Sequence, residues 1–189
     1  MSDNAADKSS DQGISMRGVF AALLGAALLA GCGPSGAPGA ARAGADVCAM
    51  ASDTRAVFGA AVESEADPGV GTIAGGCRWR SGDGAVMGEA ALFTPDSIAG
   101  DPEAATPQAM YAKLSGALEG LSEAPVEPVT GLGDEANRTQ MAFGDQTQIV
   151  VRKGDQVLLV RASAGNDVEK TNALAERLAK ALAGAEGAK

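Results

Sequence analysis

Apolar residues recur at intervals of three and four in two long stretches of the chain, a spacing typical of one helix face. The first helix is predicted to begin at Thr106-Pro107, a capping residue followed by a proline at the first helical position. Its apolar positions are Met110, Leu114, Ala117, Leu118 and Leu121. The second is predicted to follow the capping residue Asp167, and its stripe is Thr171, Leu174, Ala175, Leu178 and Leu182. A short helical stretch is predicted from Asp46, with Ser52 as a second cap.

A β-hairpin is predicted around the turn Asp83-Gly84. If these two residues form a type I′ turn, Arg78 faces Glu89. Trp79 faces Gly88 by the same register. One face of the hairpin then carries Cys77, Trp79, Val86, Gly88, Ala90 and Leu92. Trp79 is therefore interpreted as a core residue, and a ligand-stacking tryptophan is the less favoured alternative.

Further strands are predicted in the second half of the chain. A short one and three longer ones cover residues 126–129, 138–143, 146–153 and 156–162. The longer strands are joined by the turns Gly144-Asp145 and Gly154-Asp155. The predicted order is helix, hairpin, helix, strands, helix. Because tight turns join antiparallel neighbours, we predict an α+β fold, an antiparallel sheet with two or three packed helices.

The same turns divide the side chains of these strands between two faces. One face carries Ile149, Val151, Leu158 and Val160. The other carries Met141, Phe143, Val150, Val157 and Leu159 beside Arg152 and Arg161. One face must be core, so the second is either covered by helices or an apolar surface with two cations; we favour a covered face. If it is open, it is the candidate binding face, with the arginines oriented toward a carboxylate or phosphate.

The N-terminal region predicts export and lipidation. A basic residue precedes an apolar run at 19–30, which is too short to cross a membrane and has the length of a signal-peptide core. The run ends in Leu29-Ala30-Gly31-Cys32, which matches the bacterial lipobox. Residues 1–32 are therefore predicted to be a lipoprotein signal peptide with a diacylglyceryl group on Cys32. An ordinary signal peptide cleaved near the end of the run is the alternative. Met16 is a better start than the acidic residues before it.

The rest of the chain divides into a tether, a domain and a tail. Residues 33–45 are mostly Gly, Pro, Ala and Ser and are predicted to be a flexible tether. Residues 46–184 are predicted to form one α+β domain, followed by a tail at 185–189. The expected location is the cell envelope, where the lipid holds the domain on the extracytoplasmic side of an inner or outer membrane.

The remaining cysteines predict a covalent crosslink in this domain. Cys48 and Cys77 are left when Cys32 carries the lipid, and an even pair in an exported chain indicates a disulfide. The aromatic fraction is only 3%, so the core has few large side chains and a crosslink is physically useful. A redox-active pair is less favoured, because the spacing is not Cys-x-x-Cys.

The composition excludes several functions. The chain has no histidine, which excludes Ser-His-Asp and Cys-His catalysis and His-ligated zinc. A net charge of −9 without a basic cluster argues against a nucleic-acid partner. Two Gly-x-Gly-x-x-Ala stretches, from Gly69 and Gly131, are interpreted as turns because no long helix follows to bind a dinucleotide. Two carboxylate pairs are interpreted as solvated loop acids: Glu63/Glu65 and Asp134/Glu135. No catalytic residue, metal ligand or cofactor is predicted.

Several short motifs occur along residues 46–183. They are Cys48-Ala49-Met50, Cys77-x-Trp79, Gly131-x-Gly133-Asp134-x-Ala136, Lys153-Gly154-Asp155 and a closing Leu-rich helix. In these motifs the chain resembles a family of small actinobacterial cell-envelope lipoproteins that carry a domain of unknown function. The resemblance implies a lipidated envelope domain with a Cys–Cys bridge, and it brings no catalytic residues.

The expected function follows from these features. We expect a non-enzymatic lipoprotein whose binding or interaction domain is presented outside the membrane to an unknown partner, a protein or a small apolar ligand. The alternative is a carrier of a small apolar or lipidic ligand, bound on the Met141/Phe143/Leu159 face. An enzyme is the least favoured class.

Overall fold

The structure is a computed structural model that describes residues 46–122, 124–142 and 145–184. The predicted signal peptide, Cys32 and the tether lie outside the described residues, as do Phe143 and the predicted tail. Within the described ranges, no helix has the length and hydropathy needed to cross a membrane.

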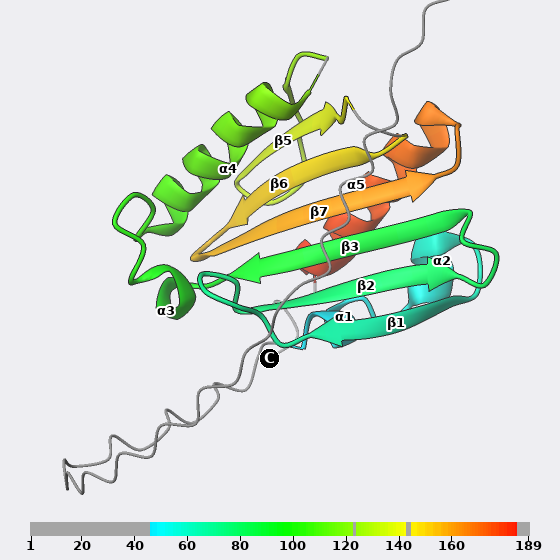
Figure 1. The fold of residues 1–189 in the computed structure, drawn as a ribbon, viewed down its shortest axis with the longest axis horizontal. Coiled ribbons are helices and arrows are strands. Elements are labelled where there is room, and N and C mark those ends of the chain that lie inside the picture. Colours follow the sequence, from blue (N-terminus) through cyan, green and yellow to red (C-terminus); the bar gives the residue numbers. More distant parts are fainter. Residues whose placement is uncertain (1–45, 123, 143–144, 185–189) are drawn as a thin grey trace, which may run out of the picture. The chain divides into compact units, whose positions relative to one another are not determined.

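One antiparallel sheet of seven strands forms the centre of the described domain (Figure 1). Across the sheet the strands are β1 (Val62–Asp67), β2 (Gly75–Ser81), β3 (Val86–Phe93), β7 (Gln156–Ala164), β6 (Thr147–Lys153), β5 (Glu135–Gln140) and β4 (Glu127–Pro128). The first three strands follow one another in the chain and form one half of the sheet. The last four form the other half, and β3 pairs with β7 where the halves meet. The predicted α+β class with an antiparallel sheet is confirmed.

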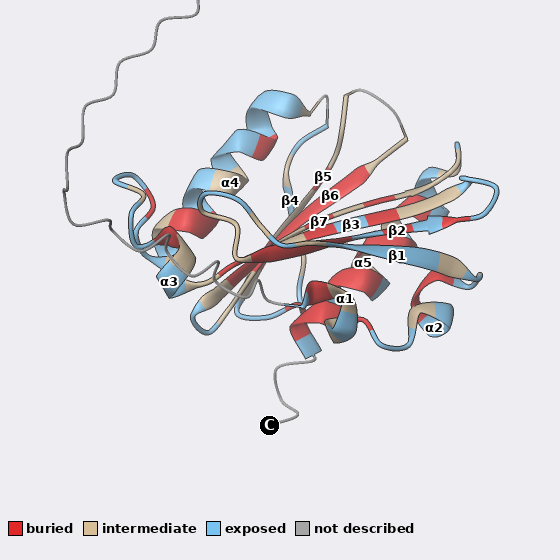
Figure 2. Cartoon of the chain, turned by 60° about the horizontal axis from the view of Figure 1, so that its bottom comes forward, coloured by how far each residue is buried: buried red, intermediate tan, exposed pale blue. Residues whose placement is uncertain are grey.

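Helices pack on both faces of this sheet, as Figure 2 shows. On one face lie α1 (Val47–Met50), α2 (Thr54–Phe58) and α5 (Val168–Gly184). On the other lie α3 (Pro95–Ile98) and α4 (Pro107–Leu121). The predicted helix–hairpin–helix–strands–helix order is not confirmed in that form. The expected hairpin is part of a meander of three strands, and a helix that was not predicted, α3, lies between this meander and α4.

The larger core lies between the sheet and the face covered by α1, α2 and α5. The predicted stripe of α5 is confirmed, since Leu174, Leu178 and Leu182 are all buried. Truncating a buried leucine of this kind to alanine costs about 2–5 kcal/mol, so α5 is a main source of stability. Two predicted caps are also confirmed: the Asp46 carboxylate accepts the N–H of Ala49, and that of Asp167 accepts the N–H of Lys170.

The β2–β3 hairpin has the predicted register, with pairs Arg78–Glu89 and Trp79–Gly88. Trp79 is 1% exposed, and its ring centroid lies 5.8 Å from that of Phe58. A Cβ on Gly88 would lie 2.7 Å from the Phe58 ring, so this position has no room for a side chain. The core interpretation of Trp79 is therefore confirmed.

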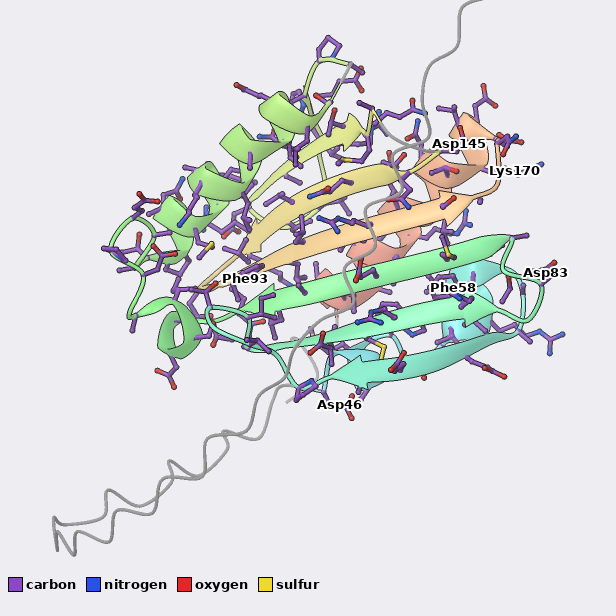
Figure 3. All side chains as sticks on the ribbon, in the orientation of Figure 1. Asp46, Phe58, Asp83, Phe93, Asp145 and Lys170 are labelled. Carbon is purple, nitrogen blue, oxygen red and sulfur yellow. A yellow bond between two sulfur atoms is a disulfide. The ribbon has the colours of Figure 1, made fainter. Side chains whose placement is uncertain are left out.

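The predicted Cys48–Cys77 disulfide is present and joins α1 to β2 (Figure 3). The bridged residues are 29 positions apart, and Asp46 stands two positions before the first of them. Because α1 is a single turn, the disulfide is its covalent attachment to the sheet. Val47 and Ala51 on either side of Cys48 are buried in the larger core.

Both edges of the sheet carry features that oppose pairing with another strand. β4 is only two residues long, and one of them is Pro128, which has no backbone N–H to donate. The other edge strand, β1, presents the exposed carboxylates Glu63 and Glu65. Short length, proline and charge are the usual protections of sheet edges.

Some local predictions are wrong. The second N-cap is Asp53 instead of Ser52, and its carboxylate accepts the N–H of Ala56 at 3.0 Å. On α4, Ala117 and Leu121 are exposed while an unpredicted residue, Tyr111, is buried. The stripe through Met110, Leu114 and Leu118 is right, but the helix is rotated about its axis so that Tyr111 faces the sheet.

The β5–β6 connection is longer than the two-residue turn that we predicted. The Met141 N–H donates to the carbonyl of Gln146, whereas the turn at Gly144-Asp145 would place Met141 opposite Gln148. This shift is two residues, an even number, so every side chain of β5 stays on its predicted face. The β6–β7 register, with Val150 opposite Leu159, is as predicted.

Candidate interaction face

The sequence-predicted binding face is largely closed by α4. Val150 and Val157 are 0% exposed and pack in a second core with Met110, Tyr111 and Leu118 of α4. Leu159 is half-buried against this core. The favoured expectation, a face covered by helices, is thus confirmed for these positions. The alternative prediction, that this face is an exposed apolar binding surface, is wrong because the helix after Thr106 lies over it.

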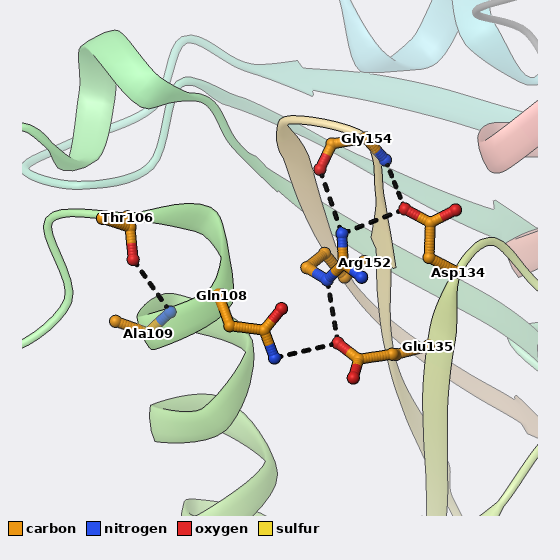
Figure 4. Close-up of polar contacts among 7 residues, drawn as sticks. All are labelled: Thr106, Gln108, Ala109, Asp134, Glu135, Arg152 and Gly154. Carbon is orange, nitrogen blue, oxygen red and sulfur yellow. Dashed lines mark hydrogen bonds and ion pairs between the residues drawn. The ribbon is translucent and has the colours of Figure 1, made fainter.

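Arg152 is held by its neighbours and is not presented to a ligand (Figure 4). Its Nε lies 2.8 Å from Glu135, and one terminal nitrogen lies 2.9 Å from Asp134. Hydrogen bonds from Arg152 and Gln108 lower the pKa of the Glu135 carboxyl below its ordinary value. The Asp134 carboxylate also accepts the N–H of Gly154. This cluster fastens the start of β5 to the β6–β7 turn and to α4.

The Gly131-x-Gly133-Asp134 motif forms the turn that brings this cluster together, in agreement with its interpretation as a turn. Gly133 has a φ of +67°, and a Cβ there would lie 2.5 Å from the carbonyl oxygen of Arg152. Only glycine allows this approach of the two backbones. The motif therefore places Asp134 beside Gly154 and has a structural explanation.

Arg161 lies instead on the part of this side of the sheet that α4 leaves uncovered. It belongs to a row of cross-strand neighbours that runs over β1, β2, β3, β7 and β6: Glu65, Arg78, Glu89, Arg161 and Gln148. Successive ion pairs along the row measure 3.8, 3.5 and 3.6 Å, and Arg161 donates to Gln148 at 3.2 Å. The first four side chains are 42–79% exposed, so these long pairs contribute little to stability.

A second row runs beside the first along the same half of the sheet. Its members are Glu63, Arg80, Met87 and Ser163. Among the described residues the Arg80 side chain has no hydrogen-bonding or ion-pair partner, and it is exposed. Met87 is half-buried in the middle of this row. We call eight residues of these two rows, without Gln148, the open face. They are Glu63, Glu65, Arg78, Arg80, Met87, Glu89, Arg161 and Ser163.

The open face is hollowed. A depression of about 600 Å³ is lined by all eight residues of the open face and by Gln146, and it is open to solvent. A smaller one of about 170 Å³ adjoins it, where Ala91 and Leu159 approach the second core. In Figure 2 the strands β1 and β2 have helices below them and none above within the described residues. The face is thus broad and shallow and carries both signs of charge.

Sequence reasoning missed the open face because it missed β1. The residues from Val62 to Asp67 alternate, with acids at every second position, and this period of two was the available signal. Glu63 and Glu65 are exposed to solvent, as expected, but they lie on a strand and not in the loop that we predicted. In the β1–β2 pair, Glu65 lies opposite Arg78 of β2.

A second hollow of about 620 Å³ lies on the other side of the sheet, between α1, α2 and α5. Its lining is mostly small and apolar, with Met50, Val57 and Ala181 among its members. Arg177 stands at this groove and donates from Nε to the carbonyl of Val57 at 2.9 Å. A small apolar ligand would meet a shallow surface here.

The described residues contain no group of three or more Cys, Asp and Glu side chains placed to hold a metal ion. No protein-family model matches this chain, and no curated protein matches it in sequence.

Proposed function

We propose that this chain is an envelope lipoprotein, anchored through a diacylglyceryl group on Cys32, whose domain is a non-enzymatic binding module for a protein. The lipobox and the apolar run before it support the anchor. The Cys48–Cys77 disulfide supports exposure to an oxidising compartment, where such bonds persist. In this proposal the module binds its partner through the open face.

The observation that carries the binding site is the half-covered sheet. The side of the sheet that bears Val150 is buried under α4, while the same side of β1 and β2, and of β3 at Met87 and Glu89, has no helix on it among the described residues. The open face consists of three arginines, three glutamates, one serine and Met87, which lies near its centre. Arginine and methionine are both enriched where proteins meet.

The chemistry of the open face favours a protein over other partners. Three arginines alternate with three glutamates, so the face has no net attraction for a polyanion such as nucleic acid. The hollow is shallow, whereas small-molecule sites enclose most of their ligand. A partner surface with its own pattern of charges matches this face best.

The anchor is tested by Cys32→Ser. This change removes the thiol that receives the lipid, so the chain should lose its acyl groups and stay out of the detergent phase in Triton X-114 partitioning. Because two or three acyl chains hold a protein on a membrane essentially permanently, the loss should be nearly complete. Ser35→Ala, three residues along, is the matched control and should partition like the wild type. Radiolabelled palmitate on the Cys32→Ser protein would contradict the anchor.

The open face is tested by photo-crosslinking in the native envelope. With p-benzoylphenylalanine at Met87, irradiation should give a defined protein adduct, because this position lies in the middle of the open face. The same group at Ala173, exposed on α5 on the far side of the sheet, is the control and should give none. Failure to form any adduct from Met87, with normal folding and anchoring, would remove the open face as the binding site.

The groove beside α5 supports a second candidate, carriage of a small apolar ligand. It rests on the apolar lining around Met50, Val57 and Ala181. Mass spectrometry of an organic extract of the purified native protein distinguishes the two functions. A stoichiometric lipid or other apolar compound would favour carriage.

A further inference from the structure

We propose that the partner of the open face is a second copy of this chain, stacked face to face about a two-fold axis parallel to the strands. This inference rests on the proposed function, because it names the partner for the same face. The axis passes between β2 and β3, at the middle of the four-strand row of charges. The two sheets then lie about 10 Å apart, as in other stacked sheets.

The order of charges along the row carries the proposal. From β1 to β7 the row reads Glu65, Arg78, Glu89, Arg161, so its charges alternate and its two ends are opposite. A two-fold axis along the strands brings β1 over β7 and β2 over β3 of the second copy. Arg78 then faces Glu89 of the second copy, and Glu65 faces Arg161 of the second copy.

The other in-plane two-fold axis is excluded by the same row. An axis running across the strands would place each residue over its own equivalent, so Glu65 would face Glu65 and Arg78 would face Arg78. Like charges brought together in an interface cost affinity. A row of alternating charges over an even number of strands therefore faces opposite charges only when the two-fold axis is parallel to the strands. Stacked twisted sheets cross at about 30°, and the pairs nearest the axis, between Arg78 and Glu89, are displaced least.

The arginines of the row have unused hydrogen-bonding capacity. The Arg78 guanidinium makes no hydrogen bond among the described residues, and its two ion pairs measure 3.5 and 3.8 Å. A guanidinium has five N–H donors and binds a carboxylate in a bidentate manner when it can approach closely. The Arg80 guanidinium has no polar partner in the described part of the chain, and the same axis places it over Met87 of the second copy.

The shape of the domain fits this stacking. α4 occupies the layer above β5, β6 and the Val157 end of β7, and a helix is about 10 Å across, which equals the spacing of stacked sheets. The layer above β1 and β2, above β3 at Met87 and Glu89, and above β7 at Arg161 and Ser163 is left for the strands of the second copy. The uncovered part of each sheet then packs on the uncovered part of the other, beside the α4 of the other copy.

The stacking also suits two chains anchored in one membrane. α1 packs on the opposite face of the sheet, so the chain that leads to Cys32 enters the domain at Asp46, away from the open face. A two-fold axis along the strands keeps both Asp46 residues at the same level. Both tethers can therefore run to the same bilayer.

The test uses charge reversal in the full lipidated chain, measured by native mass spectrometry from detergent. Wild-type protein should form dimers. Arg78→Glu and Glu89→Arg should each weaken dimerisation by at least about tenfold, because each creates two like-charge contacts across the axis. An equimolar mixture of the two variants, one of them labelled with ¹⁵N, should form mixed dimers and no more homodimers than either variant alone. Arg55→Glu, on α2 at the other face, is the matched control and should dimerise normally.

Other outcomes overturn the proposal. Monomeric wild-type protein, or mixed variants that fail to pair while each keeps its native circular dichroism spectrum, would rule out this stacking. Crosslinking from Met87 distinguishes the binding function of the open face from the identity of its partner. An adduct of twice the chain mass supports the second copy, whereas an adduct only with a different protein refutes it and leaves the binding function standing.

Discussion

Val150→Asp should abolish cooperative folding of the domain. Val150 is 0% exposed between the sheet and α4, and its surroundings are the apolar side chains of the second core. A carboxylate placed there loses its hydration and gains no partner, which costs several kcal/mol. Domains of this size have total stabilities of about 5–15 kcal/mol, so a large part or all of the native stability is lost. Urea unfolding followed by far-ultraviolet circular dichroism measures the effect.

Met87→Asp is the matched control for this prediction. Met87 lies on the same side of the sheet as Val150 but on the open half, so the new charge can remain in water. Its cost should be below about 1 kcal/mol, as for most surface substitutions. If both variants unfold, the open half is covered in the native protein. If Val150→Asp folds normally, α4 does not pack where the structure places it.

Removing the disulfide should have the second largest effect. The double change Cys48→Ala and Cys77→Ala should lower the free energy of unfolding by about 3–4 kcal/mol, since the bond closes a loop over a sequence separation of 29. The melting temperature should fall by roughly 10 °C. The double alanine variant avoids the free thiol that a single change leaves behind.

Trp79 provides a local measurement of the same effect. Its ring is 1% exposed and packs beside Phe58, in the core that the disulfide closes. Reduction of the wild-type protein should therefore shift its tryptophan emission to longer wavelength, while the double alanine variant should not respond to reductant. An unchanged melting temperature and emission after complete reduction would show that the crosslink adds nothing to this core.

Features set by neighbouring residues could be predicted from the sequence. The register of the β2–β3 hairpin follows from the Asp83-Gly84 turn, and the α5 stripe follows from its helical period. The disulfide followed from counting cysteines. Each of these depends on a short segment or on a count, so local rules suffice.

Features set by distant packing could not be predicted in this way. Alternation assigned Val150 and Arg161 to one face of the sheet correctly, but it does not say which strands of that face a helix will cover. α4 covers Val150 and leaves Arg161 open because its buried side chains pack on Val150 of β6 and on Val157 of β7, four residues before Arg161. The candidate site therefore moved from the second half of the chain to the first, onto a strand, β1, whose short acidic sequence resembles a loop.

The bond between Cys48 and Cys77 also decides how the domain bears tension. A pull on the chain at Asp46 reaches Cys48 within two residues and then crosses the sulfur atoms to Cys77. Residues 49–76, which contain α2 and β1, lie inside the closed loop and carry none of the load. The force enters β2, an interior strand held by hydrogen bonds to β1 on one side and β3 on the other. With the bond reduced, the same pull would peel α1 from the sheet and draw out α2 and β1 in turn.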